Sequence, residues 1–305
     1  MAEARRAPLS DTLWRRPRLL LALLITPPLL WLGIVYLGAL FALLAQSFFS
    51  IDEFSGLISY ELTLKTYAEL LRASNLDILL RTIAMASAVT VSAAVVAFPI
   101  AYYAARYARG RWKAVFYLGA MLPLWSSYLV KVYSWKLILA KEGVLNWLFE
   151  TLHLAWVLEA YLAIPVIGGN SLSVSWTGTF LVFLYVWLPF MILPIQASLE
   201  RVPPSMLEAS GDLGARPGQT LRYVILPLAL PGIIAGSIFT FSLTMGDYIV
   251  PQIVGTSARM IGQAVYQFQG TAGNIPLAAA FAVVPIVVMG VYLTLAKSAG
   301  AFDEL

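Results

Sequence analysis

The sequence predicts an all-α membrane protein with six transmembrane helices, on the strength of its composition and the length of its apolar runs. Of the 305 residues, 60% are hydrophobic and only 12% are charged, and the mean hydropathy is +0.80. Soluble domains carry about 25% charged residues. A helix needs about 20 apolar residues to cross the hydrocarbon core of a bilayer. Six runs reach this length, at about residues 19–48, 78–105, 114–140, 176–199, 223–250 and 275–298.

The first apolar run follows a polar, arginine-rich tail, residues 1–18. The run is about 30 residues long, from Leu19 to about Phe48. The apolar region of a signal peptide spans about 7–15 residues and ends in a small-residue cleavage site. We therefore expect this run to be a retained transmembrane helix.

Charged residues and prolines interrupt the later runs. The third run is the least regular, because Lys131 and Lys136 lie within it. In lipid a proline kinks a helix, and neighbouring groups must satisfy the carbonyl that it frees. The sequence therefore predicts a bundle of kinked helices. The prolines within the runs are Pro27, Pro28, Pro99, Pro123, Pro189, Pro194, Pro231 and Pro285.

The distribution of positive charge predicts the orientation of the chain. Cytoplasmic loops of membrane proteins carry an excess of Lys and Arg. With a cytosolic amino terminus, 13 of the 20 Lys and Arg residues fall on the inner side and 7 on the outer side or at outer helix ends. We therefore expect both termini in the cytosol. The predicted organisation is a transmembrane domain over 19–298, a cytosolic loop at 200–222, outer loops at 49–77 and 141–175, and a cytosolic tail at 299–305.

Both long outer loops contain amphipathic patterns. Residues 54–77 include Leu64, Tyr67, Leu70 and Leu71 at helical spacing. Residues 144–162 read as an amphipathic helix on the membrane surface. Two interpretations remain open for these loops: a surface that supports a partner protein, or a lid over the helix ends.

Several classes of function are excluded by what the sequence lacks. It has no cysteine, which rules out disulfides and thiolate sites, and its one histidine, His153, rules out a pair of His ligands in one chain. None of the 6 lysines follows a glycine, so no P-loop for nucleotide phosphates is present. The basic residues do not lie among exposed aromatics, which argues against nucleic acid. We therefore expect no catalytic residues, no metal site and no enzyme activity in this chain.

The polar segment between the fourth and fifth runs predicts a compact helical hairpin. Ser205 is the expected N-cap of a short helix, with Glu208 completing a capping box. Gly214 is the expected C′ residue after that helix. A turn over 215–219 follows, and a second helix is expected from near Thr220 into the fifth run. Such a knob can be gripped by a partner and moved as a rigid body.

This segment resembles the EAA loop of binding-protein-dependent ABC importer permeases. That pattern is Glu-Ala-Ala, three residues, Gly, nine residues, Ile, one residue and Leu-Pro. The corresponding residues here are Glu208, Ala209, Ser210, Gly214, Val224, Leu226 and Pro227. Ser210 and Val224 depart from the pattern, but both are conservative changes.

The resemblance extends over most of the chain and favours the polyamine branch, the spermidine/putrescine permeases, and within it the putrescine type. It is carried by residues 122–135, 188–210, 239–255 and 265–281. It implies the type I importer fold and a location in the bacterial inner membrane. It also implies three kinds of partner: a second permease with a different sequence, two ATPase subunits that bind ATP and Mg²⁺, and a periplasmic substrate-binding protein. The residues that it assigns to ATPase coupling are Glu208, Ala209, Ser210, Gly214, Leu226 and Pro227.

Asp247 is the sharpest candidate for the substrate pathway. Ionisable residues within membrane spans are costly and are functional candidates by default. A carboxylate beside an aromatic such as Tyr248 can hold an ammonium group through charge and cation–π attraction. The alternative is a structural Asp that pairs with Lys131 or Lys136 or is solvated. Trp125 and Tyr128 either line a gate or belong to an interfacial aromatic belt.

Two broader alternatives remain open from the sequence. The chain could be an autonomous secondary transporter or channel, which would need intramembrane acid–base relays; Asp247 is the only acid placed for one. Within the importer class, the cargo could instead be ferric iron, thiosulfate, a phosphonate or an opine.

Overall fold

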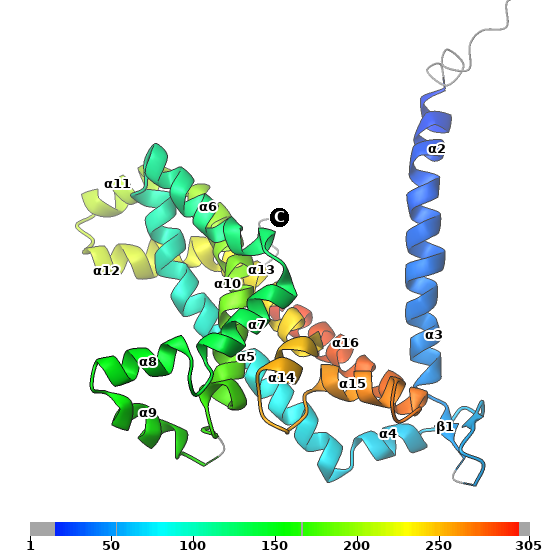
Figure 1. Ribbon diagram of the computed structural model, residues 1–305. Helices are drawn as coiled ribbons and strands as arrows, with labels where there is room; N and C mark the ends of the chain where they lie inside the picture. The colour runs from blue at the N-terminus through cyan, green and yellow to red at the C-terminus, as the bar shows by residue number, and fades with distance from the viewer. Residues whose placement is uncertain (1–15, 53, 166, 299–305) are drawn as a thin grey trace, which may run out of the picture.

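The computed structural model describes residues 16–52, 54–165 and 167–298, which form a mainly helical protein (Figure 1). The predicted tails outside these ranges are therefore not described. The first half contains α2 (Pro17–Leu30), π-helix η1 (Trp31–Leu37), α3 (Gly38–Gln46), β1 (Ser50–Ile51), β2 (Ile58–Ser59), α4 (Lys65–Leu70), α5 (Ala73–Arg106), α6 (Arg111–Trp125), α7 (Tyr128–Ile138), α8 (Val144–Thr151) and α9 (Ala155–Leu162). The second half contains 3-10 helix η2 (Leu172–Val174), α10 (Trp176–Glu200), α11 (Pro204–Asp212), α12 (Pro217–Thr220), π-helix η3 (Leu221–Ile225), α13 (Leu226–Gly246), α14 (Ile249–Ile253), α15 (Ile261–Gln269) and α16 (Ile275–Ser298).

Five helical stretches of the described chain are long and apolar enough to cross a membrane. They are Pro17–Gln46, Ala73–Arg106, Trp176–Glu200, Pro217–Gly246 and Ile275–Lys297. A sixth crossing is present if α6 and α7 count as one span, although they are bent by 96°. The predicted six-helix architecture is therefore confirmed, with the third span broken.

The break in the third span has a local cause. Pro123 lies in the last turn of α6, and Ser126 and Ser127 after it are extended, with ψ angles of 148° and 133°. The Nζ of Lys131 donates a hydrogen bond of 2.7 Å to the carbonyl oxygen of Pro123. Lys131, which interrupts the third apolar run, therefore satisfies the carbonyl of Pro123 at the bend.

The core of the bundle is α10, which lies against both α5 and α13 (Figure 1). Close approach depends on small residues, as expected for helix packing in lipid. A Cβ added at Gly232 would lie 2.5 Å from the carbonyl oxygen of Pro194, and one added at Gly236 would lie 2.7 Å from the sulfur of Met191. The buried face of α5 is likewise lined with alanines: Ala86, Ala93, Ala97, Ala101 and Ala104.

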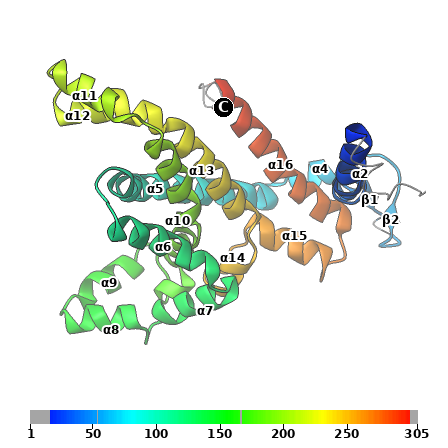
Figure 2. The same cartoon turned by 90° about the horizontal axis from the view of Figure 1, so that it is seen from above.

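The first span stands apart from this core. Neither α2, η1 nor α3 contains a buried residue, and only the α3 end packs against α16. In both views α2 rises away from α5, α10 and α13 (Figure 1, Figure 2). Large apolar side chains such as Trp31, Ile34 and Phe41 are exposed along it. Apart from its α3 end, this span therefore offers its apolar surface to lipid or to another subunit.

The segments between spans gather at two ends of the bundle. Helices α11 and α12 lie at one end, where α2 also begins, and α4, α8, α9 and α14 lie toward the other (Figure 1). The helix expected within 54–77 is found as α4. At the same end β1 and β2 form a small antiparallel hairpin, with Ser50 opposite Ser59.

The single surface helix expected over 144–162 is wrong, because two short helices, α8 and α9, replace it. His153 lies between them with a positive φ of 57°, a conformation that a continuing helix cannot adopt. The fifth span also ends earlier than expected, at Gly246, because Asp247 starts a new turn.

We expect Gly236→Leu to destabilise the bundle, because overpacking a close helix contact costs about 1–3 kcal/mol. Thermal unfolding of the purified chain in detergent should show a lower midpoint. The matched control is Gly290→Leu in α16, where no atom lies within 4 Å of an added Cβ. Equal midpoints for the two variants would contradict the close packing of α10 on α13.

Candidate functional site

The polar segment between α10 and α13 folds into the 204–220 hairpin, which consists of α11, a turn and α12. Helix α11 begins at Pro204, and its N-cap, Pro203, makes no side-chain cap. The capping box expected from Ser205 and Glu208 is therefore wrong. Proline has no N–H and its φ suits the first helical position, so Pro204 starts the helix two residues earlier than an N-cap at Ser205 predicts.

The end of α11 follows the prediction. The helix stops at Asp212 and its C-cap is Leu213. Gly214 then adopts a φ of +76°, and its amide donates a hydrogen bond of 2.8 Å to the carbonyl oxygen of Gly211. A residue with a Cβ is strained in this left-handed conformation, so Gly214 sets the direction in which the chain returns.

The return helix starts three residues before the predicted position, at Pro217. The side-chain oxygen of Gln219 accepts a hydrogen bond of 2.8 Å from the amide of Arg216, which closes the helix start. Helix α12 then runs through η3 into α13 without a break in the helical backbone. Leu226 and Pro227 are the first two residues of α13, so they lie at the root of the hairpin and not at its tip.

The two helices of the hairpin are joined by a side-chain bond. The hydroxyls of Ser210 and Thr220 lie 2.9 Å apart, and Ser210 is buried. Ser210 therefore faces the return helix, where the alanine of the EAA pattern could make no such bond. Glu208, Ala209 and Gly214 are exposed.

Exposed apolar side chains accompany these residues on the hairpin. Within the hairpin, Leu213 is 88% exposed and Met206 is also exposed, and Tyr223, just beyond the hairpin in η3, is 68% exposed. The sequence analysis did not single them out. For Leu213, the sequence did offer a sign of exposure: it is an apolar residue directly before the C′ glycine Gly214, at the end of a short polar helix.

At the other end of the bundle, Asp247 joins α13, α14 and α7. Its Oδ1 accepts hydrogen bonds from the amides of Ile249 at 2.7 Å and Val250 at 2.9 Å. Its Oδ2 accepts a hydrogen bond from the hydroxyl of Tyr128. All three donors are neutral, so the negative charge of the carboxylate is not cancelled by them.

The expected alternative, an ion pair with Lys131 or Lys136, is not formed. Among the described residues, no basic nitrogen lies within 4.0 Å of a carboxylate oxygen of Asp247. Lys131 instead binds the carbonyl of Pro123. Asp247 therefore combines a structural role in starting α14 with a carboxylate charge that no cation of the described chain neutralises.

Two stacked aromatic pairs include the residue that binds the Asp247 carboxylate, Tyr128, and the residue that follows Asp247 in the chain, Tyr248. Tyr128 stacks on Trp187 of α10, with ring centroids 5.8 Å apart, and Tyr248 stacks on Tyr266 of α15, with centroids 5.0 Å apart. The sequence analysis missed Trp187 and Tyr266, which only the packing of α10 and α15 brings near. Trp125, at the end of α6, is 70% exposed and is joined to this cluster by no ring contact or hydrogen bond within the described chain.

Trp187 carries an unsatisfied donor. Its side chain is nearly fully buried, and its indole Nε1 has no hydrogen-bond partner among the described residues. A buried polar group without a partner is costly. The aromatic cluster therefore contains one donor that an acceptor could still engage.

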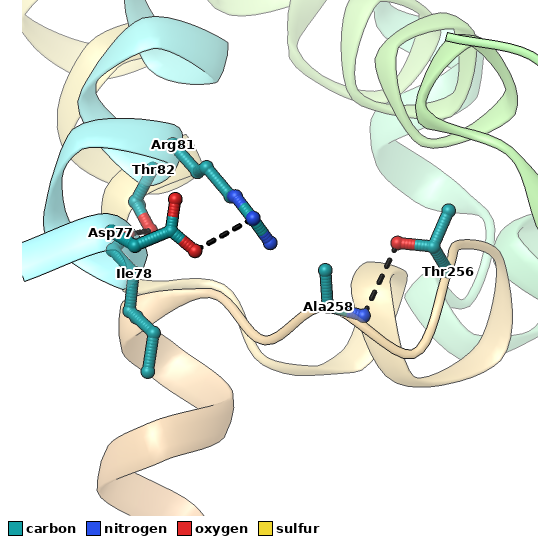
Figure 3. A network of polar contacts seen from close by, with 6 residues as sticks. All are labelled: Asp77, Ile78, Arg81, Thr82, Thr256 and Ala258. Atoms are coloured by element: carbon teal, nitrogen blue, oxygen red, sulfur yellow. Dashed lines mark hydrogen bonds and ion pairs between the residues drawn. The ribbon is translucent and has the colours of Figure 1, made fainter. Parts of the chain in front are cut away.

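One side-chain hydrogen bond holds the start of α15, the helix that carries Tyr266, against α5. The hydroxyl of Thr82 accepts it from the amide of Ile261 at 3.0 Å. Figure 3 shows two separate polar contacts nearby: an ion pair of 2.7 Å between Arg81 and Asp77 within α5, and a hydrogen bond of 3.3 Å from the amide of Ala258 to the hydroxyl of Thr256. These contacts lie at the end of the bundle that carries Asp247.

Comparison with known proteins identifies the family. Residues 97–299 match the family described as binding-protein-dependent transport system inner membrane component. The chain is 56% identical over 296 residues to the inner membrane ABC transporter permease protein YdcU of Escherichia coli K12, covering 97% of this chain and 95% of the relative. It is 29% identical over 256 residues to the spermidine/putrescine transport system permease protein PotB of the same organism, covering 82% and 87%.

Solved structures show the same fold. A bacterial alginate ABC transporter in complex with a periplasmic protein carrying alginate pentasaccharide aligns with a TM-score of 0.66 at 14% identity, covering 95% of this chain and 96% of that chain. The inward-facing MetNI methionine ABC transporter aligns with a TM-score of 0.51 at 19% identity, covering 75% and 97%. The chain therefore belongs to the inner membrane components of binding-protein-dependent transport systems and has the type I ABC importer permease fold.

Proposed function

We propose that this permease subunit imports a small polar cation, a polyamine such as putrescine, across the bacterial inner membrane at the expense of ATP. The observation that carries the proposal is the Asp247 carboxylate, which is bound by neutral donors, Tyr128 among them, and is followed in the chain by Tyr248. A carboxylate beside aromatic rings attracts an ammonium group through charge and ring quadrupole together. The relationship to PotB, whose name specifies spermidine and putrescine, supports the same class of cargo.

ATP and Mg²⁺ bind to separate ATPase subunits in this proposal, and the 204–220 hairpin is their docking point. Glu208 offers a charge to a basic residue, Ala209 permits close approach, and Leu213 adds exposed apolar surface. The bond between Ser210 and Thr220 keeps the two helices together. The hairpin can therefore move as one unit when the ATPase subunits move.

A second permease completes the pathway. The first span supports this part of the proposal, because it has no buried residue and, within the described chain, only its α3 end packs against α16. The chain resembles both PotB and, at 39% identity over 80 residues, the permease PotC of Escherichia coli K12, which supports a partner with a different sequence. That local match covers 26% of this chain and 30% of PotC.

The proposed orientation places both termini and the 204–220 hairpin in the cytosol. A periplasmic binding protein then delivers the cargo at the end that carries α8, α9 and Asp247. ATP binding closes the two ATPase subunits, the hairpins move together, and the bundle shifts from inward-facing to outward-facing. Such a shift requires that nucleotide bind the two states with different affinity.

The physical chemistry of the site discriminates among other cargoes. Thiosulfate and phosphonates are anions, which the unneutralised Asp247 would repel. Ferric iron prefers several oxygen ligands, and no group of three or more His, Asp or Glu side chains in the described chain is placed to hold a metal ion. Membership of a binding-protein-dependent transport family also argues against the alternative of an autonomous secondary transporter.

We expect Gly214→Pro and Glu208→Lys to uncouple ATP hydrolysis from uptake. Proline cannot adopt the φ of +76° at Gly214, and the lysine reverses the charge offered to the ATPase. Uptake by the assembled importer in proteoliposomes should fall by about tenfold or more, which corresponds to about 1.4 kcal/mol of lost coupling. Matched controls are Gly218→Ala, where φ is not positive, and Glu61→Lys at the other end of the bundle. Wild-type uptake in both test variants at equal membrane abundance would refute the docking role.

We expect Asp247→Asn to lower the maximal rate of putrescine uptake by about tenfold, because a hydrogen bond to a charged group contributes about 1.5–3 kcal/mol. Asparagine retains an oxygen for the amides of Ile249 and Val250, so α14 should still form. Co-purification with the partner subunits checks assembly. The control is Asp77→Asn, which also removes a carboxylate at this end of the bundle. Unchanged kinetics for Asp247→Asn would leave Asp247 with a structural role alone.

A further inference from the structure

One carboxylate binds α6 to the end of α10, directly before the 204–220 hairpin; residues 198–202 are called the hairpin root. Glu200 is the last residue of α10, and its Oε1 accepts hydrogen bonds from the Nζ of Lys113 at 2.9 Å and the hydroxyl of Tyr117 at 2.8 Å. The side chain of Gln196, one turn earlier on α10, adds a longer contact of 3.4 Å. Lys113 and Tyr117 lie one turn apart on α6. The end of α10 is thereby bound to one face of α6.

Neighbouring residues bind the same root to other helices. Arg106, the last residue of α5, donates from Nη2 to the carbonyl oxygen of Val202 at 2.9 Å. The hydroxyl of Ser198 donates to the carbonyl oxygen of Leu228 on α13, also at 2.9 Å. The few residues before the hairpin are therefore joined by side chains to α5, α6 and α13, so they cannot move independently of these helices.

Helix α6 is otherwise loosely held. Ala120 is its only buried residue. Apolar packing therefore contributes little to its position, and the polar contacts at Lys113 and Tyr117 weigh correspondingly more. Charge-assisted hydrogen bonds are shorter and stronger than neutral ones and have defined geometry, which makes this joint suited to carrying a displacement.

The far end of α6 leads to the Asp247 cluster. The helix has 15 residues and spans about 22 Å at 1.5 Å per residue. Lys131 of α7 bridges the bend by binding the carbonyl of Pro123, and Tyr128 of α7 donates to Asp247. Each step from the hairpin root to Asp247 is thus a covalent connection within a helix or a side-chain bond.

We propose that α6 is a lever, and that Lys113, Tyr117 and Glu200 are positioning residues that pass movement of the 204–220 hairpin to the Tyr128–Asp247 contact. The proposal rests on the proposed function, in which the hairpin is moved by an ATPase. The energetic coupling between the two sites is measured by a double-mutant cycle at the contact of Lys113 with Glu200.

The test uses the complete importer, with both permeases, the ATPase and the binding protein, in proteoliposomes. The ratio of putrescine imported to ATP hydrolysed is measured for Lys113→Glu, Glu200→Lys and the double variant with both changes. Each single variant should lower the ratio by about tenfold, the upper range for mutations along a coupling route. The double variant should restore most of it, because the opposite charges face each other again. Lys113→Arg should keep the wild-type ratio.

The matched control is the same exchange at Asp77 and Arg81, an ion pair of 2.7 Å on α5 that contacts no lever residue. These variants should leave the ratio unchanged. Tyr117→Phe removes a single hydroxyl and covers the case in which a charge reversal prevents assembly; it should lower the ratio by about threefold, since one hydrogen bond is lost.

The lever proposal is overturned if assembled importers with Lys113→Glu or Glu200→Lys keep the wild-type ratio of putrescine imported to ATP hydrolysed. It is also overturned if the double variant has a ratio no higher than that of the single variants. Should the single variants not assemble, an unchanged ratio in Tyr117→Phe overturns it equally. These outcomes differ from failure of the proposed function, which would appear as absence of ATP-driven putrescine uptake in the wild-type complex.

Discussion

The structure depends on the close approach of α10 to α5 and α13. Helices in lipid gain little from burying apolar side chains against one another, so van der Waals contact between backbones becomes decisive. Gly232 and Gly236 provide it on α13, where an added Cβ would meet Pro194 or Met191 of α10. Because these three helices are held rigidly, the polar groups at their ends acquire fixed positions. The hairpin root and the Asp247 cluster are both built on this frame.

Polar contacts are concentrated at the two ends of the frame. At one end Glu200 gathers Lys113 and Tyr117 beside the root of the 204–220 hairpin. At the other, Asp247 gathers Tyr128 and the first amides of α14. Helices α6 and α7 connect the two ends, and Ala120 is the only buried residue of α6. An energy-coupled importer needs such a division: a rigid middle, and ends whose bonds can be exchanged when a partner moves.

The isolated chain is visibly one part of an assembly. Its first span has no buried residue, and the hairpin exposes both Leu213 and Glu208. These are different kinds of surface. The span presents mostly apolar groups and suits lipid or another membrane helix. The hairpin mixes charge with apolar side chains and suits a soluble protein surface. Family membership agrees with this division, because such inner membrane components work within binding-protein-dependent systems.

The sequence by itself determined the helical class, the number of spans and the place of the hairpin, because apolar run length and the spacing around Gly214 act locally. It also pointed to Asp247, since a lone carboxylate in an apolar run is costly. Only the tertiary structure decided what these residues touch. Three features depend on contacts between separate helices: the bond from Ser210 to Thr220, the stacking of Trp187 on Tyr128 and of Tyr266 on Tyr248, and the joint at Glu200. Periodicity along one helix carries no information about which face of another helix it meets.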